Sequence, residues 1–259
     1  MTGPAPLLEF FKRGEVAGDV RLLAAQGGLG LRAHEQLAIL MLLVDDPDPA
    51  IGRTADETLK RIPEAALKTF LARPDVPIAL REFFADRGVL AGDTPSAGAL
   101  EDEDQPLIDA AALDEPIVEA EKKSLIQQLA EMGFTERLKA AIKGSREVRA
   151  ILIRDTNKMI SAAVLSGPQV TPPEVESFAR MANVSEDILR VIGNTRAWVK
   201  NYGVVVALTK NPKTPIAMSL NLMTRLRDRD VATLSVDRNV PDPLRVAARR
   251  RVTDATSRK

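Results

Sequence analysis

The feature that most limits what this chain can fold into is a regular interruption of its apolar segments after residue 180. Asn183, Asn211 and Asn239 follow one another at intervals of 28 residues. Each closes an apolar segment, and two or three residues later a Ser, Thr or Pro opens the next one. A fixed period of this length is typical of stacked helical hairpins, in which each repeat packs mainly on its neighbours. The spacing therefore predicts an all-α protein that contains a helical-repeat array, or α-solenoid.

The composition agrees with a helical protein that buries a core. Of the 259 residues, 45% are hydrophobic and 28% are charged, whereas aromatic residues make up only 3%. The longest apolar run, residues 37–44, is far shorter than the roughly 20 residues that a membrane helix needs. Residues 1–14 carry charges and lack the long apolar core of a signal peptide. We therefore expect a cytoplasmic protein without membrane insertion.

Changes in composition divide the chain into three segments and a tail. The N-terminal segment alternates apolar stretches with Gly and Pro turns, and residues 31–44 become apolar all round, as in a buried helix. The next segment has acidic residues but no Lys or Arg, a composition that buries too little apolar surface to become ordered. We expect a helical N-terminal domain at 1–90, an acidic flexible linker at 91–118, a helical-repeat domain at 119–252 and a polar tail at 253–259.

The turn sequence Leu-Thr-Lys-Asn-Pro-Lys-Thr-Pro at residues 208–215 joins two apolar segments. It resembles the junctions between helices in leucine-rich repeat variant and HEAT-like proteins. Similar turns that contain proline occur at residues 46–49, 73–77 and 167–172. These families form curved helical arrays that bind macromolecules or hold assemblies together, and they share no catalytic residues. The resemblance therefore implies a smaller helical N-terminal domain beside a HEAT-like array, in a non-enzymatic scaffold or adaptor for a protein partner.

Residues that carry most enzyme chemistry are scarce in this sequence. The chain has no cysteine and one histidine, His34. It therefore lacks a Cys/His zinc set and a thiol nucleophile, and a Ser-His-Asp triad would have to use His34. The glycines within residues 27–30 are not followed by Lys-Ser or Lys-Thr, so they predict the end of a helix rather than a phosphate-binding loop. We expect no enzymatic activity, no metal and no cofactor.

Two aromatic residues are candidates for contact with a protein partner. Trp198 and Tyr202 are four residues apart in a predicted helix over 196–210, so they would share one face of it. Because Trp and Tyr are favoured at interfaces, these two and their neighbours Lys200 and Asn201 are the first candidate binding residues. The alternative is that both rings pack between repeats, with the Tyr202 hydroxyl bonded to a polar neighbour. Burial of Trp198 would favour that alternative.

Charge is divided unevenly, although the net charge of the chain is zero. Residues 1–121 hold 11 Lys and Arg against 23 Asp and Glu, whereas residues 122–259 hold 25 against 13. The candidate anion-binding residues of the basic half are Arg225, Arg227, Arg229, Arg245 and Arg249. Such clusters bind nucleic acid or another polyanion, or they form a solvated face with internal ion pairs. A third interpretation is contact between the acidic and basic halves of the same chain.

Overall fold

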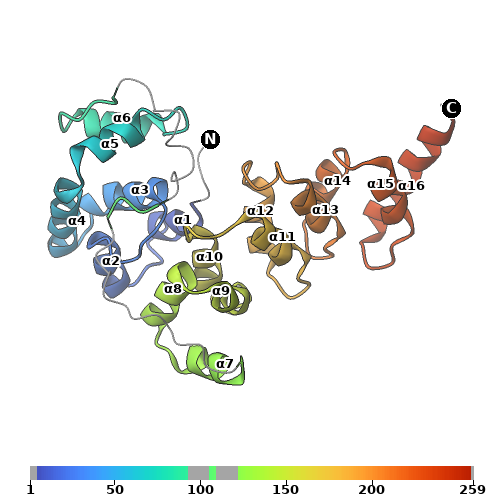
Figure 1. Ribbon diagram of the computed structural model, residues 1–259, viewed down its shortest axis with the longest axis horizontal. Helices are drawn as coiled ribbons and strands as arrows, with labels where there is room; N and C mark the ends of the chain where they lie inside the picture. Colours follow the sequence, from blue (N-terminus) through green and yellow to red (C-terminus); the bar gives the residue numbers. More distant parts are fainter. Residues whose placement is uncertain (1–4, 93–104, 109–121, 258–259) are drawn as a thin grey trace. The chain divides into compact units, whose positions relative to one another are not determined.

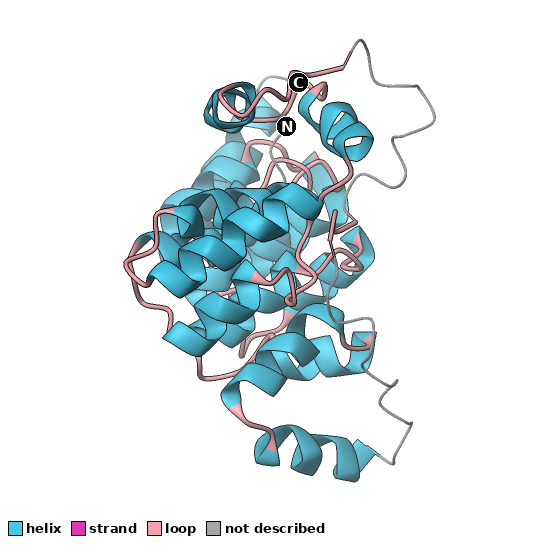
Figure 2. Cartoon of the chain, turned by 90° about the vertical axis from the view of Figure 1, so that its left-hand side faces the viewer, coloured by secondary structure: helices cyan, strands magenta, loops and turns pink. Residues whose placement is uncertain are grey.

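The computed structural model describes residues 5–92, 105–108 and 122–257. Within these ranges the regular secondary structure consists of sixteen α-helices, and no strand occurs (Figures 1 and 2). This confirms the all-α class that the sequence predicted. Backbone packing divides the chain into two compact units, residues 1–169 and residues 170–259, and each unit is described separately below.

The first unit is organised around one buried helix, α3. The helices described in this unit are α1 (Pro6–Lys12), α2 (Gly18–Ala25), α3 (Ala33–Val44), α4 (Pro49–Arg61), α5 (Glu64–Leu71), α6 (Ile78–Ala85), α7 (Lys122–Glu131), α8 (Phe134–Lys143), α9 (Arg146–Leu152) and α10 (Lys158–Ser166). Helix α3 packs against α1, α2, α4 and α6, and Figure 1 shows it beside α1 and α4. Leu37, Ile39 and Leu40 of this helix are fully enclosed. The sequence prediction of a buried helix at residues 31–44 is therefore confirmed.

Buried polar side chains at the start of α3 form hydrogen bonds with the ends of two helices that are distant in the sequence. Arg32 donates from Nε and Nη2 to the carbonyl oxygen of Gly167, at 3.1 and 2.9 Å, where α10 ends. Glu35 accepts hydrogen bonds from the backbone amides of Leu7 and Leu8 in the first turn of α1, at 2.7 and 3.2 Å. Helices leave such terminal amides and carbonyls without partners of their own. Two side chains at the start of α3 thus provide hydrogen-bond partners for amides at the start of α1 and for a carbonyl at the end of α10.

The division into units differs from the one expected from composition. Helix α10 packs against both α1 and α8, which joins the helices after residue 122 to those before residue 90. The second unit therefore begins at residue 170, whereas the sequence placed the start of the helical-repeat domain at residue 119. A change of charge along the chain had marked that expected boundary, and charge does not determine packing. The greater part of the expected linker at 91–118 lies outside the described residues, so contact between the acidic and basic halves stays a prediction.

Short turns with buried residues separate the helices of the second unit. These helices are α11 (Pro172–Arg180), α12 (Glu186–Asn194), α13 (Tyr202–Lys210), α14 (Ile216–Met223), α15 (Asp228–Val236) and α16 (Asp242–Ser257). Besides Thr195, Val199 and Asn211, these turns bury a series with one member in each turn: Val170, Val184, Trp198, Thr214, Leu226 and Val240. They follow one another at 14, 14, 16, 12 and 14 residues, and four of them donate their amide to the carbonyl three residues earlier. Two members of this series that have one other member between them are therefore 26 to 30 residues apart in the sequence.

The three asparagines that first indicated this period differ in their structural roles. Asn211 is 4% exposed, and its Nδ2 donates to the carbonyls of Ala179 and Met181, at 2.8 and 3.0 Å, at the end of α11. Its Oδ1 accepts a nearby backbone amide at 3.0 Å. Asn183 and Asn239 are exposed and stand two positions later in their turns than Asn211 does in its own. The period is thus carried by the buried turn residues, and Asn211 alone of the three connects two helices.

We predict that Asn211→Ala destabilises the second unit by about 2 kcal/mol, because the variant removes two long-range hydrogen bonds at a buried helix end. Trp198 is the only tryptophan of the chain and lies in this unit, so its fluorescence during urea unfolding follows this unit. Asn183→Ala is the matched control, with an expected change below about 0.5 kcal/mol because Asn183 is exposed. Equal losses in both variants would contradict the assigned role of Asn211.

Glu35 has an unusual environment for a carboxyl group. It is completely buried, and burial raises the pKa of Glu35 to about 7. The Ser166 hydroxyl, the two amides of α1 and the charge of Arg32 oppose this rise. Neither Glu35 Oε2 nor the Ser166 hydroxyl completes a hydrogen bond of good geometry with another described residue. A neutral Glu35 is therefore the favoured form at mildly acidic pH.

Glu35 should make the stability of the first unit depend on pH. Its folded pKa is raised above the value of 4.5 for a free side chain, so its stabilising contribution is fully present below about 4.5 and is lost as pH rises through about 7. We predict that Glu35→Gln, which keeps an acceptor for the α1 amides, reduces this loss by up to roughly 3 kcal/mol. Thermal unfolding of both proteins, followed by circular dichroism between pH 5 and pH 8, measures this loss of stability. Parallel pH profiles for the variant and the wild type would contradict the prediction.

Candidate functional site

Trp198, the first candidate contact residue, belongs to the core of the second unit. Its side chain is 4% exposed, and it occupies the buried position of the turn before α13. Helix α13 begins at Tyr202, six residues later than the start of the predicted helix over 196–210, so the two rings do not share a helix face. The ring of Trp198 is therefore not accessible as an anchor for a partner. The position of Trp198 agrees with the alternative interpretation, in which the ring packs inside the protein.

Asn201 explains why the helix starts late. Its Oδ1 accepts the backbone amide of Gly203 at 2.8 Å, which makes Asn201 the N-cap of α13. Asn side chains that bond the backbone two residues ahead compete with a continuing helix and favour a new helix start. Asn201 therefore has a structural role, whereas Lys200, in the same turn, is exposed and stays a candidate contact residue.

Tyr202 connects α13 to the start of α15. Its hydroxyl donates to Asp230 Oδ2 at 2.5 Å and accepts from the backbone amide of Arg227 at 2.9 Å. The guanidinium carbon of Arg227 lies 4.6 Å from the centre of the Tyr202 ring, the geometry of a cation–π contact. Arg229 Nε lies 3.7 Å from Asp230, and 74% of the Arg229 side chain is exposed. The structure thus brings together one aromatic ring, two arginines and one aspartate on neighbouring turns.

Two of the other candidate arginines are exposed residues whose guanidinium groups bind the backbone. Arg225 Nη2 donates to the carbonyl of Val199 at 2.6 Å. Arg249 Nε donates to the carbonyl of Ser235, in the last turn of α15, at 3.0 Å. A guanidinium group has five N–H donors, so a single bond of this kind fixes its direction and leaves most of its donors for an anion.

Arg245 differs from the other four candidates because it is half-buried. It pairs with Asp242 one turn earlier on α16 and bonds to the carbonyl of Asp237 at 3.5 Å. Its charge is therefore balanced locally. The five arginines do not form one uniform site: four of them are exposed, whereas Arg245 is half-buried.

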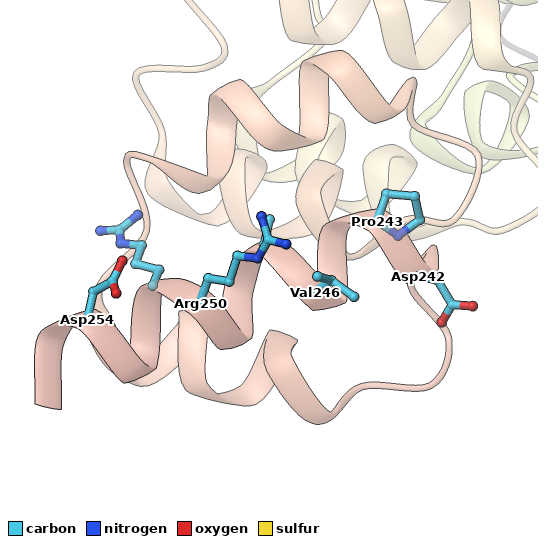
Figure 3. Close-up of a pocket in the computed structure, with 7 residues that line it drawn as sticks. Asp242, Pro243, Val246, Arg250 and Asp254 are labelled. Carbon is cyan, nitrogen blue, oxygen red and sulfur yellow. The ribbon is translucent and has the colours of Figure 1, made fainter. Parts of the chain in front are cut away.

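The outer face of α16 has a shallow, open depression that sequence reasoning missed (Figure 3). It is lined by Asp242, Pro243, Val246, Ala247, Arg250, Arg251 and Asp254. Val246 is 45% exposed, so part of this face is apolar. The apolar pair Pro243 and Val246, three residues apart, was the available signal in the sequence, but it was obscured by the four arginines of the same helix.

Sites of other kinds have little support in the described part of the chain. The only histidine, His34, is half-buried near the start of α3. In the described residues no group of three or more His, Cys, Asp and Glu side chains is placed to hold a metal ion. No helix among residues 5–92 and 122–257 combines the length and apolar character needed to cross a bilayer.

Comparisons with known proteins do not identify a relative. No protein-family model matches the chain, and neither a curated protein nor a solved structure matches it. The resemblance to HEAT-like proteins therefore rests on the turn sequences alone. Function has to be argued from the residues of the site, because a fold by itself does not define one.

The burial of Trp198 makes a direct spectroscopic prediction. As the only tryptophan of the chain and 4% exposed, it should emit at short wavelength in the native protein and be quenched only weakly by iodide. Unfolding in urea should shift the emission to longer wavelength and increase the quenching. Native quenching as strong as that of the unfolded chain would show that Trp198 lies on the surface.

Proposed function

We propose that this chain is a non-enzymatic scaffold or adaptor whose second unit is a HEAT-like helical-repeat array that binds an acidic segment of a protein partner. The recurring turns support the array, since each buries at least one residue and the buried residues of alternate turns lie 26 to 30 residues apart. One histidine and no cysteine in the sequence support a role in binding rather than in catalysis.

The observation that carries the proposal is a set of exposed arginines with fixed guanidinium groups. Arg225 and Arg249 are each held by a backbone carbonyl, and Arg227 is held over the ring of Tyr202. All three arginines are exposed. A donor that is already oriented loses less conformational freedom on binding, and its hydrogen bonds to a carboxylate are charge-assisted. Such oriented donors therefore suit an anionic partner.

The interleaving of charges favours a protein over nucleic acid as that partner. Residues 225–251 contain eight arginines, and four aspartates are interspersed among them. Nucleic acid presents an unbroken line of phosphates, which aspartates along the track would repel. An acidic protein segment carries both signs of charge and meets such a mixed surface with complementary pairs.

Nucleic acid or another polyanion is the second candidate partner. The observation that favours it is the overall charge of the second unit, since residues 170–259 contain 16 Lys and Arg against 9 Asp and Glu, a balance of +7. Binding to phosphates weakens steeply with salt because counterions are released, with a slope that grows with the number of phosphates contacted. A few carboxylate contacts to a peptide give a shallower dependence.

Fluorescence anisotropy with the full chain tests the proposal. The probes are a labelled acidic peptide in which lysines are interspersed among a larger number of glutamates, a labelled DNA duplex and a labelled RNA strand, each titrated at several salt concentrations. We predict that the peptide binds and that the double variant Arg227→Gln and Arg229→Gln weakens binding roughly tenfold or more, through loss of charge-assisted hydrogen bonds.

The matched control is the double variant Arg180→Gln and Arg190→Gln. It removes the same charge from exposed arginines of the second unit that pair with Glu176 and Glu186 on their own helices. Its binding should change less than about twofold, as expected for exposed ion pairs away from the contact. Tighter binding of DNA or RNA with a steep salt slope would favour the second candidate. Equal weakening in both double variants, or no binding of any probe at low salt, would refute a specific arginine site.

A further inference from the structure

A four-residue segment of the chain, Gln-Pro-Leu-Ile at 105–108, is bound to the first unit by one buried side chain. Gln36 of α3 is 3% exposed, and its Oε1 accepts from the amides of Leu107 and Ile108 at 2.9 and 3.2 Å. Its Nε2 donates to the carbonyl of Ile108 at 2.5 Å. All three bonds go to the backbone of the segment, which bends at Leu107, and two consecutive amides reach the same oxygen, so the carboxamide holds a bent main chain.

The side chain of Ile108 lies in a space that only a glycine leaves open. Gly27 has a φ of 76°, and a Cβ there would lie 2.7 Å from Ile108 Cγ2 and 3.6 Å from Thr58 Cγ2. A larger residue at position 27 would therefore be strained by its backbone and would clash with Ile108. Beside it the wall is apolar, with Leu29 and Ile39 near Gln36. The surface thus combines hydrogen bonds to the backbone of the segment with a space for one aliphatic side chain.

Two features of the bound segment define what this surface selects. Pro106 restricts its own backbone and favours an extended residue before it, which suits a segment bound through its main chain. Leu107 and Ile108 remain half-buried, so the segment lies on the surface of the unit and does not form part of its core. The contact needs only a bent main chain and an aliphatic residue at the position of Ile108, and both can be supplied by another chain.

We propose that this surface of the first unit is a recognition site for a short protein segment with a Pro-Leu-Ile core that bends at the leucine, and that residues 105–108 occupy it in cis as a built-in competitor. A segment of the same chain has a high effective concentration and excludes a partner of similar intrinsic affinity. The partner is thus a protein that presents proline followed by two aliphatic residues in a segment free to bend. This inference concerns the first unit and is independent of the arginine surface of the second.

A peptide-binding experiment on the full chain tests the proposal. The probe is a labelled peptide with the sequence of residues 103–110, and the protein variant Leu107→Pro with Ile108→Pro vacates the site without altering its walls, because it removes both amide donors and the Ile108 side chain. We expect weak binding to the wild type and at least roughly tenfold tighter binding to the variant, because the internal competitor is removed. If the variant, folded by circular dichroism, binds the peptide no better than the wild type, the proposal is refuted.

Changes in the peptide test the geometry without altering the protein. A peptide with Ile108→Ser should bind the vacated variant at least roughly tenfold more weakly, because it cannot fill the space beside Gly27. A peptide with Gln105→Ala is the matched control, since Gln105 is exposed, and its affinity should stay within about twofold. Equal affinity for the Ile108→Ser peptide and the unchanged peptide would show non-specific binding and overturn the proposal.

Discussion

Each helix leaves amides at its start and carbonyls at its end without a partner of its own, and a chain built from many short helices multiplies such groups. This protein satisfies several of them from side chains that are distant in the sequence. Glu35 bonds the start of α1, Arg32 the end of α10, Asn211 the end of α11 and Arg249 the last turn of α15. Because buried backbone groups without partners cost free energy, these polar contacts are as necessary to the packing as the apolar core.

The same constraint changes how the arginines of the second unit are interpreted. A high arginine content alone suggests a polyanion ligand, yet Arg251 donates to the carbonyls of Met223 and Leu226 and has a clear structural use. The functional proposal therefore rests on arginines such as Arg227 and Arg229, which are exposed next to a fixed aromatic ring. Some arginines, such as Arg251, are thus explained by the fold. The exposed arginines with oriented guanidinium groups are the ones that suit a partner.

The sequence predicted the helices and the buried α3 well, because apolar periodicity and turn residues report local structure. It placed Trp198 wrongly in a helix, since the cap formed by Asn201 is a local competitor that the apolar pattern does not reveal. The contact of Gln36 with Ile108 joins residues 72 positions apart and leaves no periodic signal. The role of Asn211 was equally hidden, because Asn183 and Asn239 have the same spacing without the same bonds. Long-range polar contacts were thus the part that the sequence could not predict.

Amide hydrogen exchange of the intact chain, measured by NMR, tests most directly whether distant side chains hold the backbone in this way. The informative amides are Leu7 and Leu8, in the first turn of α1, and Leu107 and Ile108, outside any helix. Amides in such places normally exchange rapidly. The account predicts strong protection of all four, since each is an observed donor to Glu35 or Gln36. Exchange at the rate of an unstructured peptide at these four positions would contradict it.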